Sequence, residues 1–197
     1  MQKITPFLWF DNQAEEAMNF YTSIFKNSKV GKISRYGEAG PGTTGSVMSA
    51  TFQLEGQEFI ALNGGPLFTF SPAISFFVDC ETQEEVDELW QKLSQGGETQ
   101  RCGWLKDKYG ISWQIIPSAL GETLQDKDDE KSERVMKAML QMDKIDIRGL
   151  KQAYDGNADC GSRIPECATT EAQSAPSILA WAPVGFTRSL SDFAAKR

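Results

Sequence analysis

The chain has 197 residues, enough for one domain with a tail or for two small half-domains that share a core. Its formal net charge is −7, which argues against binding to nucleic acid, whose phosphates attract basic surfaces. The sequence contains no histidine, which excludes Ser-His-Asp and Cys-His catalysis and removes the commonest side-chain ligand of transition metals.

The first half predicts a strand, a helix and three further strands. Residues 4–10 are mostly apolar, as in a buried strand. Apolar residues then recur at helical spacing: Ala14, Ala17, Met18, Tyr21, Ile24 and Phe25. Asn12, with Glu15 three residues later, predicts a capping box at the start of this helix. Strands are predicted for 29–36, 46–54 and 57–62.

The second half repeats this order after a segment rich in Gly and Pro, residues 63–72. A strand is predicted for 73–79, a helix capped by Thr82, and strands near 98–104 and 111–117. The Asp after the first strand recurs 68 residues later, as Asp11 and Asp79. A repeat this long indicates a duplicated half-domain, because solenoid repeats are shorter.

Past Pro117 the character of the sequence changes. Residues 132–142 and 145–154 predict two helices, the first with a face rich in Met, Val and Leu. From residue 157 onward no periodicity is visible, and we expect an irregular or disordered tail. The four cysteines fit no zinc-binding spacing, so we expect reduced, structural thiols.

Several stretches resemble the PhnB-like family, which often carries the label 3-demethylubiquinone-9 3-methyltransferase. They are Phe7–Asp11, Ala14–Tyr21, Leu62–Pro66, Ala73–Ser75, Cys102–Pro117 and Val135–Ile147. This family is part of the vicinal oxygen chelate superfamily, which includes glyoxalase I, bleomycin-resistance proteins and ring-cleaving dioxygenases. The resemblance covers about residues 3–156, and its most specific part is the Cys102–Pro117 stretch.

The resemblance implies an α+β fold in which two tandem βαβββ modules form a cleft between curved mixed sheets, followed by a C-terminal helical extension. The corresponding boundaries are 1–66 and 67–120 for the modules, 121–156 for the extension and 157–197 for the tail. Small members of the superfamily are usually homodimers, and we expect the same of this chain.

Metal-dependent members of the superfamily place their ligands at positions that fall here near Pro6, Ser49 or Thr51, Ala73 and Gln114. None of these is a carboxylate, thiolate or imidazole, so we expect no metal and no cofactor. The segment Gly37–Gly45 lacks the Lys-Ser/Thr ending and the following helix of a phosphate-binding loop, and is interpreted as a mobile loop between strands.

Aromatic and polar side chains on the elements that form the cleft are the predicted ligand-binding residues. They are Trp9, Thr51, Asn63, Phe68, Phe70, Cys102, Trp104 and Gln114. Alternation in the last strand places Ser112 and Gln114 in the cleft and Trp113 on the helix-covered side. Asp107 and Lys108 are interpreted as a solvated turn.

Three functional hypotheses remain open at this point. The first is a protein that binds a small, partly aromatic or apolar molecule without a metal. The second is an enzyme, either a methyltransferase as the family label suggests or a metal-assisted isomerase or lyase. The third is a structural module whose own side chains fill the cleft.

No apolar run approaches the roughly 18 residues that cross a bilayer, and no apolar leader opens the sequence, so we expect a cytoplasmic protein.

Overall fold

A computed structural model describes residues 3–157, which divide into two compact units. The first unit comprises the residues up to Pro117 together with Gln141–Ile145, and the second comprises Ser118–Leu140 and the residues from Asp146 onward. Cys160, Cys167 and all but the first residue of the predicted tail lie outside the described residues.

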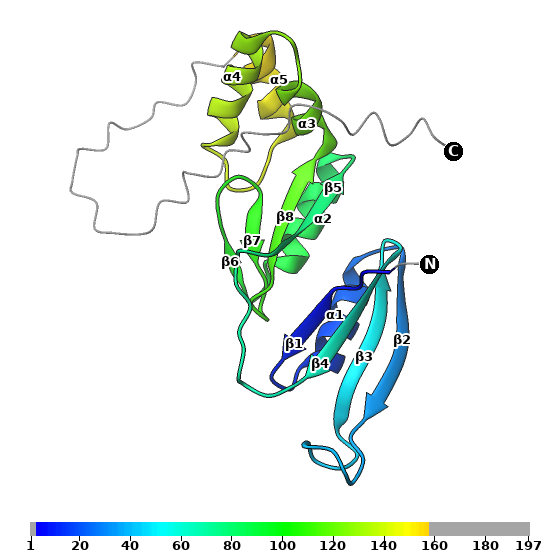
Figure 1. The fold of residues 1–197 in the computed structure, drawn as a ribbon. Coiled ribbons are helices and arrows are strands. Elements are labelled where there is room, and N and C mark those ends of the chain that lie inside the picture. The colour runs from blue at the N-terminus through cyan, green and yellow to red at the C-terminus, as the bar shows by residue number, and fades with distance from the viewer. Residues whose placement is uncertain (1–2, 158–197) are drawn as a thin grey trace, which may run out of the picture. The chain divides into compact units, whose positions relative to one another are not determined.

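The first unit contains two modules with the same order of elements (Figure 1). The first module consists of β1 (Phe7–Phe10), α1 (Ala14–Ile24), β2 (Ser28–Arg35), β3 (Val47–Leu54) and β4 (Gln57–Asn63). The second consists of β5 (Ser75–Cys80), α2 (Gln83–Leu93), β6 (Glu98–Thr99), β7 (Trp104–Lys106) and β8 (Ser112–Pro117). Both have the plan that the sequence predicts.

The two sheets share one topology, which confirms the duplication. Their strand orders are β1-β4-β3-β2 and β5-β8-β7-β6. In each, the first strand is parallel to the last strand of its module and the other neighbours are antiparallel. The fold class is therefore α+β with two four-stranded mixed sheets and C-terminal helices, as predicted.

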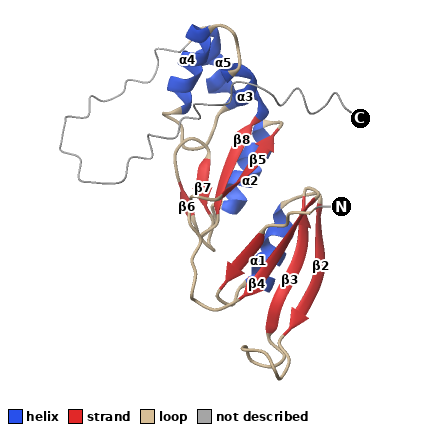
Figure 2. Cartoon of the chain, in the orientation of Figure 1, coloured by secondary structure: helices blue, strands red, loops and turns tan. Residues whose placement is uncertain are grey.

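Each sheet buries the face that carries its helix (Figure 2). On β3, Ala50, Phe52 and Leu54 are buried, whereas the alternate residues are half-buried. On β8, Trp113 is only 3% exposed and packs against Phe76 and Tyr21, which confirms its predicted place on the helix-covered side. We call the opposite side of each sheet its distal face.

Hydrogen bonds and aromatic contacts join the two modules. The hydroxyl of Tyr21 on α1 donates to the carboxylate of Asp107, in the β7–β8 turn, over 2.7 Å. Lys108 forms an ion pair with Glu16 at 2.8 Å, and the hydroxyl of Tyr109 donates to the same carboxylate. The β7–β8 turn of the second module is thus attached to the helix of the first.

The solvated-turn interpretation of Asp107 is wrong, because its side chain is only 2% exposed.

Two other local predictions are also corrected. The helix α1 has no capping box: Gln13 is its N-cap residue, and the backbone N–H of Ala14 donates to Asn63 Oδ1, which lies on β4. A tertiary contact therefore supplies the acceptor that Asn12 was expected to provide.

The predicted strand near 98–104 is also interrupted. It forms two short strands, β6 and β7, separated by a bend in which Cys102 and Gly103 both have positive φ, 60° and 79°. The backbone N–H groups of these two residues donate to the carbonyls of Met142 and Asp143 instead of to a sheet. Thr82, by contrast, caps α2 as predicted, since its side chain accepts from the N–H of Glu85.

The second unit is helical, with α3 (Ser118–Leu124), α4 (Asp129–Met139) and α5 (Ile147–Asp155). Its buried residues are Leu120, Val135, Met139, Leu150 and Ala153. The guanidinium of Arg134 donates to the carbonyls of Ala153 and Tyr154 and so satisfies the end of α5. Two of the helices were predicted, and α3 was not. Within residues 3–157, no helix has the length and apolar character needed to cross a membrane.

Candidate functional site

The distal face of the second sheet presents a row of three side chains from three neighbouring strands. Gln114 on β8 is paired with Phe77 on β5 and with Trp104 on β7. Residues paired in this way point to the same face of a sheet. The structure therefore brings together two predicted ligand-binding residues, Trp104 and Gln114, and adds Phe77 beside them.

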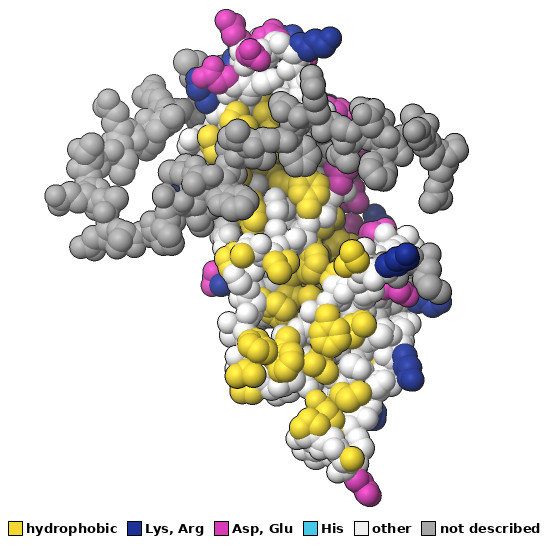
Figure 3. Space-filling view, viewed as in Figure 1, with side chains coloured by type: hydrophobic (Ala, Val, Ile, Leu, Met, Phe, Trp, Pro, Cys, Tyr) yellow, Lys and Arg dark blue, Asp and Glu magenta, His cyan; other side chains and the backbone are white. Residues whose placement is uncertain are grey.

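The row is apolar at its ends and polar at its centre. Phe77 is 56% exposed, and Trp104 and Gln114 are half-buried. The amide Nε2 of Gln114 donates to Ser75 Oγ over 2.8 Å. Figure 3 shows hydrophobic side chains gathered over both modules on the side that the view presents. Small-molecule sites combine apolar and aromatic side chains with a few fixed polar groups, and this row contains both kinds.

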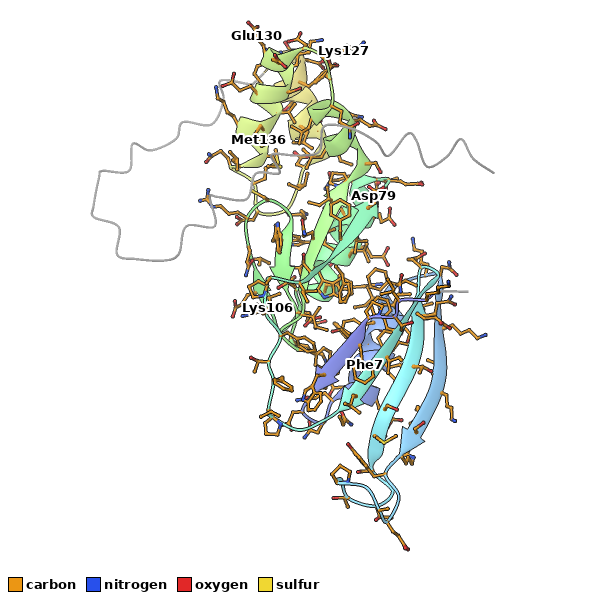
Figure 4. The ribbon with its side chains drawn as sticks, viewed as in Figure 1. Phe7, Asp79, Lys106, Lys127, Glu130 and Met136 are labelled. Atoms are coloured by element: carbon orange, nitrogen blue, oxygen red, sulfur yellow. The ribbon has the colours of Figure 1, made fainter. Side chains whose placement is uncertain are left out.

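An ion pair borders this row. Lys106, labelled in Figure 4 at the end of β7, lies 2.9 Å from Glu98 on β6. The side chain of Glu98 is 64% exposed and that of Lys106 is 36% exposed, so the pair is open to solvent and contributes little to stability. The two charges of this pair cancel, and Phe77, Gln114 and Trp104 are themselves uncharged.

Three other predicted residues gather where the chain leaves the first module. The indole N–H of Trp9 donates to the carbonyl of Gly65 over 2.9 Å, and Phe68 packs edge-on against the Trp9 ring at 5.0 Å. Asn63 uses both ends of its side-chain amide: Oδ1 accepts from Ala14 N and Nδ2 donates to the Val47 carbonyl. These contacts fix the path of the chain between the modules.

The remaining three predicted residues are dispersed. Thr51 lies on the distal face of the first sheet, where its hydroxyl accepts from the backbone N–H of Lys32 at a bulge of β2. Phe70 packs edge-on against Phe10 and borders the core. Cys102 lies in the bend before β7, and burial raises the pKa of its thiol. Ligand contact at all eight positions stays a prediction.

Asp107 is the most buried charged residue of residues 3–157, with only 2% of its surface exposed. It accepts four hydrogen bonds, from the Tyr21 hydroxyl, the Trp113 indole and the backbone N–H groups of Tyr109 and Ile111, over 2.7–3.0 Å. Burial raises the pKa of Asp107 above its ordinary value of 3.8, and the donated hydrogen bonds oppose this shift. The same burial and the nearby carboxylate raise the pKa of Tyr21 well above its usual value.

A raised pKa in the folded state predicts a specific pH dependence. The folded protein binds the Asp107 proton more tightly than the unfolded chain, so this residue favours folding more as the pH falls from the folded-state pKa towards 3.8. Asp107→Asn removes this titration. We expect the free energy of unfolding of wild type, minus that of Asp107→Asn, to increase as the pH falls through that window. Urea unfolding at a series of pH values measures this difference. A difference that does not change with pH would contradict the raised pKa.

The metal positions of the superfamily do not carry a ligand set here. Those that map to this chain are Pro6, Ser49 or Thr51, Ala73 and Gln114, and they offer only hydroxyl and amide oxygens as side-chain donors. Among residues 3–157, no three His, Cys, Asp or Glu side chains are grouped so as to hold a metal ion. The residues present therefore do not fit the metal of the superfamily's enzymes.

The Gly-rich segment Gly37–Gly45 connects β2 to β3, and a strand follows it, as predicted. It folds around Tyr36, whose hydroxyl donates to the carbonyl of Asn63 over 2.7 Å. A Cβ atom on Gly42 would overlap the Tyr36 ring, so a larger residue here would require that ring to move. No helix N-terminus follows the loop to bind a phosphate group.

A family model described as 3-demethylubiquinone-9 3-methyltransferase matches residues 2–116, more than half of the chain. The chain belongs to this family. A Bacillus cereus structure, described as a putative 3-demethylubiquinone-9 3-methyltransferase and PhnB protein, is 50% identical over 59% of this chain and 100% of its own, with a TM-score of 0.56. The PhnB-like relationship inferred from the Cys102–Pro117 stretch is thereby confirmed.

Two weaker structural likenesses concern the fold alone. A Pseudomonas aeruginosa protein is 19% identical over 57% of this chain and 95% of its own, with a TM-score of 0.48. A glyoxylase/bleomycin resistance protein/dioxygenase domain from Frankia is 18% identical over 57% and 94%, with a TM-score of 0.38. No curated protein matches the chain.

Sequence reasoning missed Phe77 and Ser75 in this member of the 3-demethylubiquinone-9 3-methyltransferase family. A signal for both was present, because Phe77 alternates with Ser75 and Asp79 along a strand whose other residues face the helix. This alternation places Phe77 on the face away from the helix, and the parallel pairing of β5 with β8 in the structure sets it beside Gln114.

Proposed function

We propose that this chain binds a small, partly aromatic molecule on the distal face of its second sheet, between Phe77 and Trp104, without using a metal. The observation that carries the proposal is the row Phe77–Gln114–Trp104, in which two aromatic side chains flank one amide. Phe77 is 56% exposed on β5, so its ring is accessible to a ligand.

The spacing of the row suits a flat ligand. Phe77 and Trp104 are separated by two strand-to-strand steps, which correspond to about 10 Å between their Cα atoms. Within the described residues, no ring contact joins Phe77 to Trp104 or to any other aromatic side chain. An aromatic ring inserted there would contact both side chains, and each such pair adds about 0.5–1.5 kcal/mol beyond the area that it buries.

The family description supports a second candidate, an enzyme that transfers a methyl group. Methyl transfer requires a site for a nucleotide-sized donor, and the Gly-rich turn between a strand and a helix that commonly binds such donors has no counterpart within residues 3–157. A metal-assisted isomerase or lyase requires strong ligands at positions now occupied by Pro6, Ala73 and Gln114. We therefore rank ligand binding first.

The proposal predicts that aromatic truncation within the row weakens binding. We expect 2-naphthol, used as the probe, to quench the tryptophan fluorescence of the full chain and to bind about tenfold more weakly to Trp104→Ala and Phe77→Ala. Phe7→Ala is the matched control, because Phe7 is also 56% exposed but lies on β1 of the first sheet. Equal losses in all three variants, or none, would contradict the site.

Native mass spectrometry of the full chain separates the alternatives. We expect uptake of 2-naphthol and no stoichiometric uptake of S-adenosylmethionine or Mn²⁺. Stoichiometric S-adenosylmethionine would favour the methyltransferase candidate, and stoichiometric Mn²⁺ would favour the metal-assisted one. The same spectra report the number of chains in the assembly, for which we propose a homodimer, since large apolar side chains such as Ile4, Leu67 and Ile74 are mostly exposed.

A further inference from the structure

A short segment, Gln141–Ile145, packs on the second module although the helices α3 and α4 separate it from β8 in the chain. We call this segment the strap. It belongs to the first unit, whereas the residues on both sides of it belong to the second. The strap therefore connects the helical unit to the module that carries the row Phe77–Gln114–Trp104.

The carbonyl groups of the strap hold the bend that precedes β7. The backbone N–H of Cys102 donates to the carbonyl of Met142 over 2.8 Å. That of Gly103 donates to the carbonyl of Asp143 over 2.7 Å. Both bend residues have positive φ, a conformation that a cysteine rarely adopts unless the surrounding structure maintains it. The strap contributes to that support, since it accepts a hydrogen bond from each of them.

The strap is itself attached to the helix of the second module. Lys144 forms an ion pair with Asp87 on α2 at 2.6 Å. Gln83, one turn earlier on α2, donates from Nε2 to the carbonyl of Ile145 over 3.1 Å. The Ile145 side chain is fully buried and lies against the bend, since a Cβ atom on Gly103 would be 3.2 Å from its Cγ1 atom. Ile145 therefore links α2 to the bend.

The bend leads directly into Trp104, one of the two aromatic side chains of the row. The backbone N–H of Trp104 donates to the carbonyl of Arg101 over 3.2 Å, so its own backbone closes the bend. The carbonyl of Gly103 accepts from the N–H of Ile115, the neighbour of Gln114 on β8, over 2.8 Å. A shift of the bend would therefore move the Trp104 ring relative to Gln114.

We infer that the strap sets the position of Trp104 in the ligand site, and that Ile145 is the positioning residue through which it acts. The effect on ligand binding rests on the proposed function, whereas the effect on Trp104 does not. A ring that is already held in its bound position loses less freedom when a ligand arrives, so the strap favours binding. Ile145 is buried and acts only through the bend.

The test labels the five tryptophans of the full chain with 5-fluorotryptophan and follows them by ¹⁹F NMR. Trp104→Phe and Trp9→Phe identify two of the resonances by their loss. We expect Ile145→Ala to shift the Trp104 resonance, to leave that of Trp9 in place, and to weaken binding of 2-naphthol about fivefold. Ile145→Val retains most of the packing and is expected to restore both the resonance and the affinity.

Two further variants complete the comparison. Lys144→Ala removes the ion pair with Asp87 without creating a cavity, and we expect a smaller change in the same direction. It tests the strap even if Ile145→Ala does not fold, which circular dichroism reports. Leu150→Ala is the matched control, because Leu150 is also fully buried but lies on α5 in the second unit. We expect it to leave the Trp104 resonance unchanged.

The outcomes distinguish the inference from the function on which it partly rests. If the strap variants leave the Trp104 resonance in place, or if Leu150→Ala shifts it equally, the strap does not position Trp104. If the resonance shifts and the affinity for 2-naphthol is unchanged, the assigned role in binding is overturned. If wild type does not bind 2-naphthol, the proposed function fails, and the shift of the Trp104 resonance alone decides the role of the strap.

Discussion

Asp107→Ala is expected to destabilise the first unit by about 3–5 kcal/mol, a large share of the stability of an ordinary domain. The substitution leaves the Tyr21 hydroxyl, the Trp113 indole and two backbone N–H groups without the carboxylate that accepts from them. Each buried donor that loses its acceptor costs about 1–3 kcal/mol, and partial rearrangement keeps the total below the simple sum.

The measurement is urea unfolding of the full chain, followed by far-UV circular dichroism and tryptophan fluorescence. Asp11→Ala is the matched control, because Asp11 follows the first strand of the chain with its side chain exposed, and we expect a change within about 0.5 kcal/mol. An Asp107→Ala protein as stable as the control would show that the carboxylate does not hold the modules together.

Gly97→Ala is expected to cost about 3 kcal/mol although it adds only one methyl group. A Cβ atom at this position would overlap the carbonyl oxygen of Lys106 and lie 2.9 Å from the Cα atom of Asp107. Both obstacles are backbone, which cannot rotate away as a side chain does. The turn that carries Asp107 would have to move, and its hydrogen bonds to the first module would be strained.

Gly37→Ala is the control for this substitution, since a Cβ atom at Gly37 meets nothing within 4 Å. We expect Gly37→Ala to leave the urea midpoint nearly unchanged or to raise it slightly, because alanine restricts the unfolded chain. The double variant Gly97→Ala/Asp107→Ala should be less destabilised than the sum of its parts, because both act on one turn. Strict additivity would contradict this account.

The order of the elements was predictable because both modules carry strong local signals. Apolar residues at helical spacing identified α1 and α2, and alternation identified β3 and β8. The duplication also predicted that the two halves share a topology. The bend at Cys102 and Gly103 was not predictable, since its backbone groups pair with residues 142 and 143, some forty positions further along the chain.

The site was predictable only in part, for a similar reason. Trp104 and Gln114 could be assigned to one face because they belong to adjacent strands of a predicted hairpin. Phe77 reaches the same row through a parallel pairing between the first and last strands of the module, which no local pattern shows. The burial of Asp107 depends on Tyr21, 86 residues away, and turn residues of this kind are usually solvated.

The separation of 86 residues between Tyr21 and Asp107 in the sequence has a consequence for biosynthesis. All strands of the first module pair within residues 7–63, so that sheet can form while the rest of the chain is still on the ribosome. Tyr21, however, must wait for Asp107, 86 residues later, or about 4–17 s at typical translation rates. Until then Tyr21, Phe25 and Phe59 expose an aromatic surface that the second module later covers. The nascent first module therefore presents an exposed aromatic surface during synthesis, and surfaces of this kind are prone to aggregation.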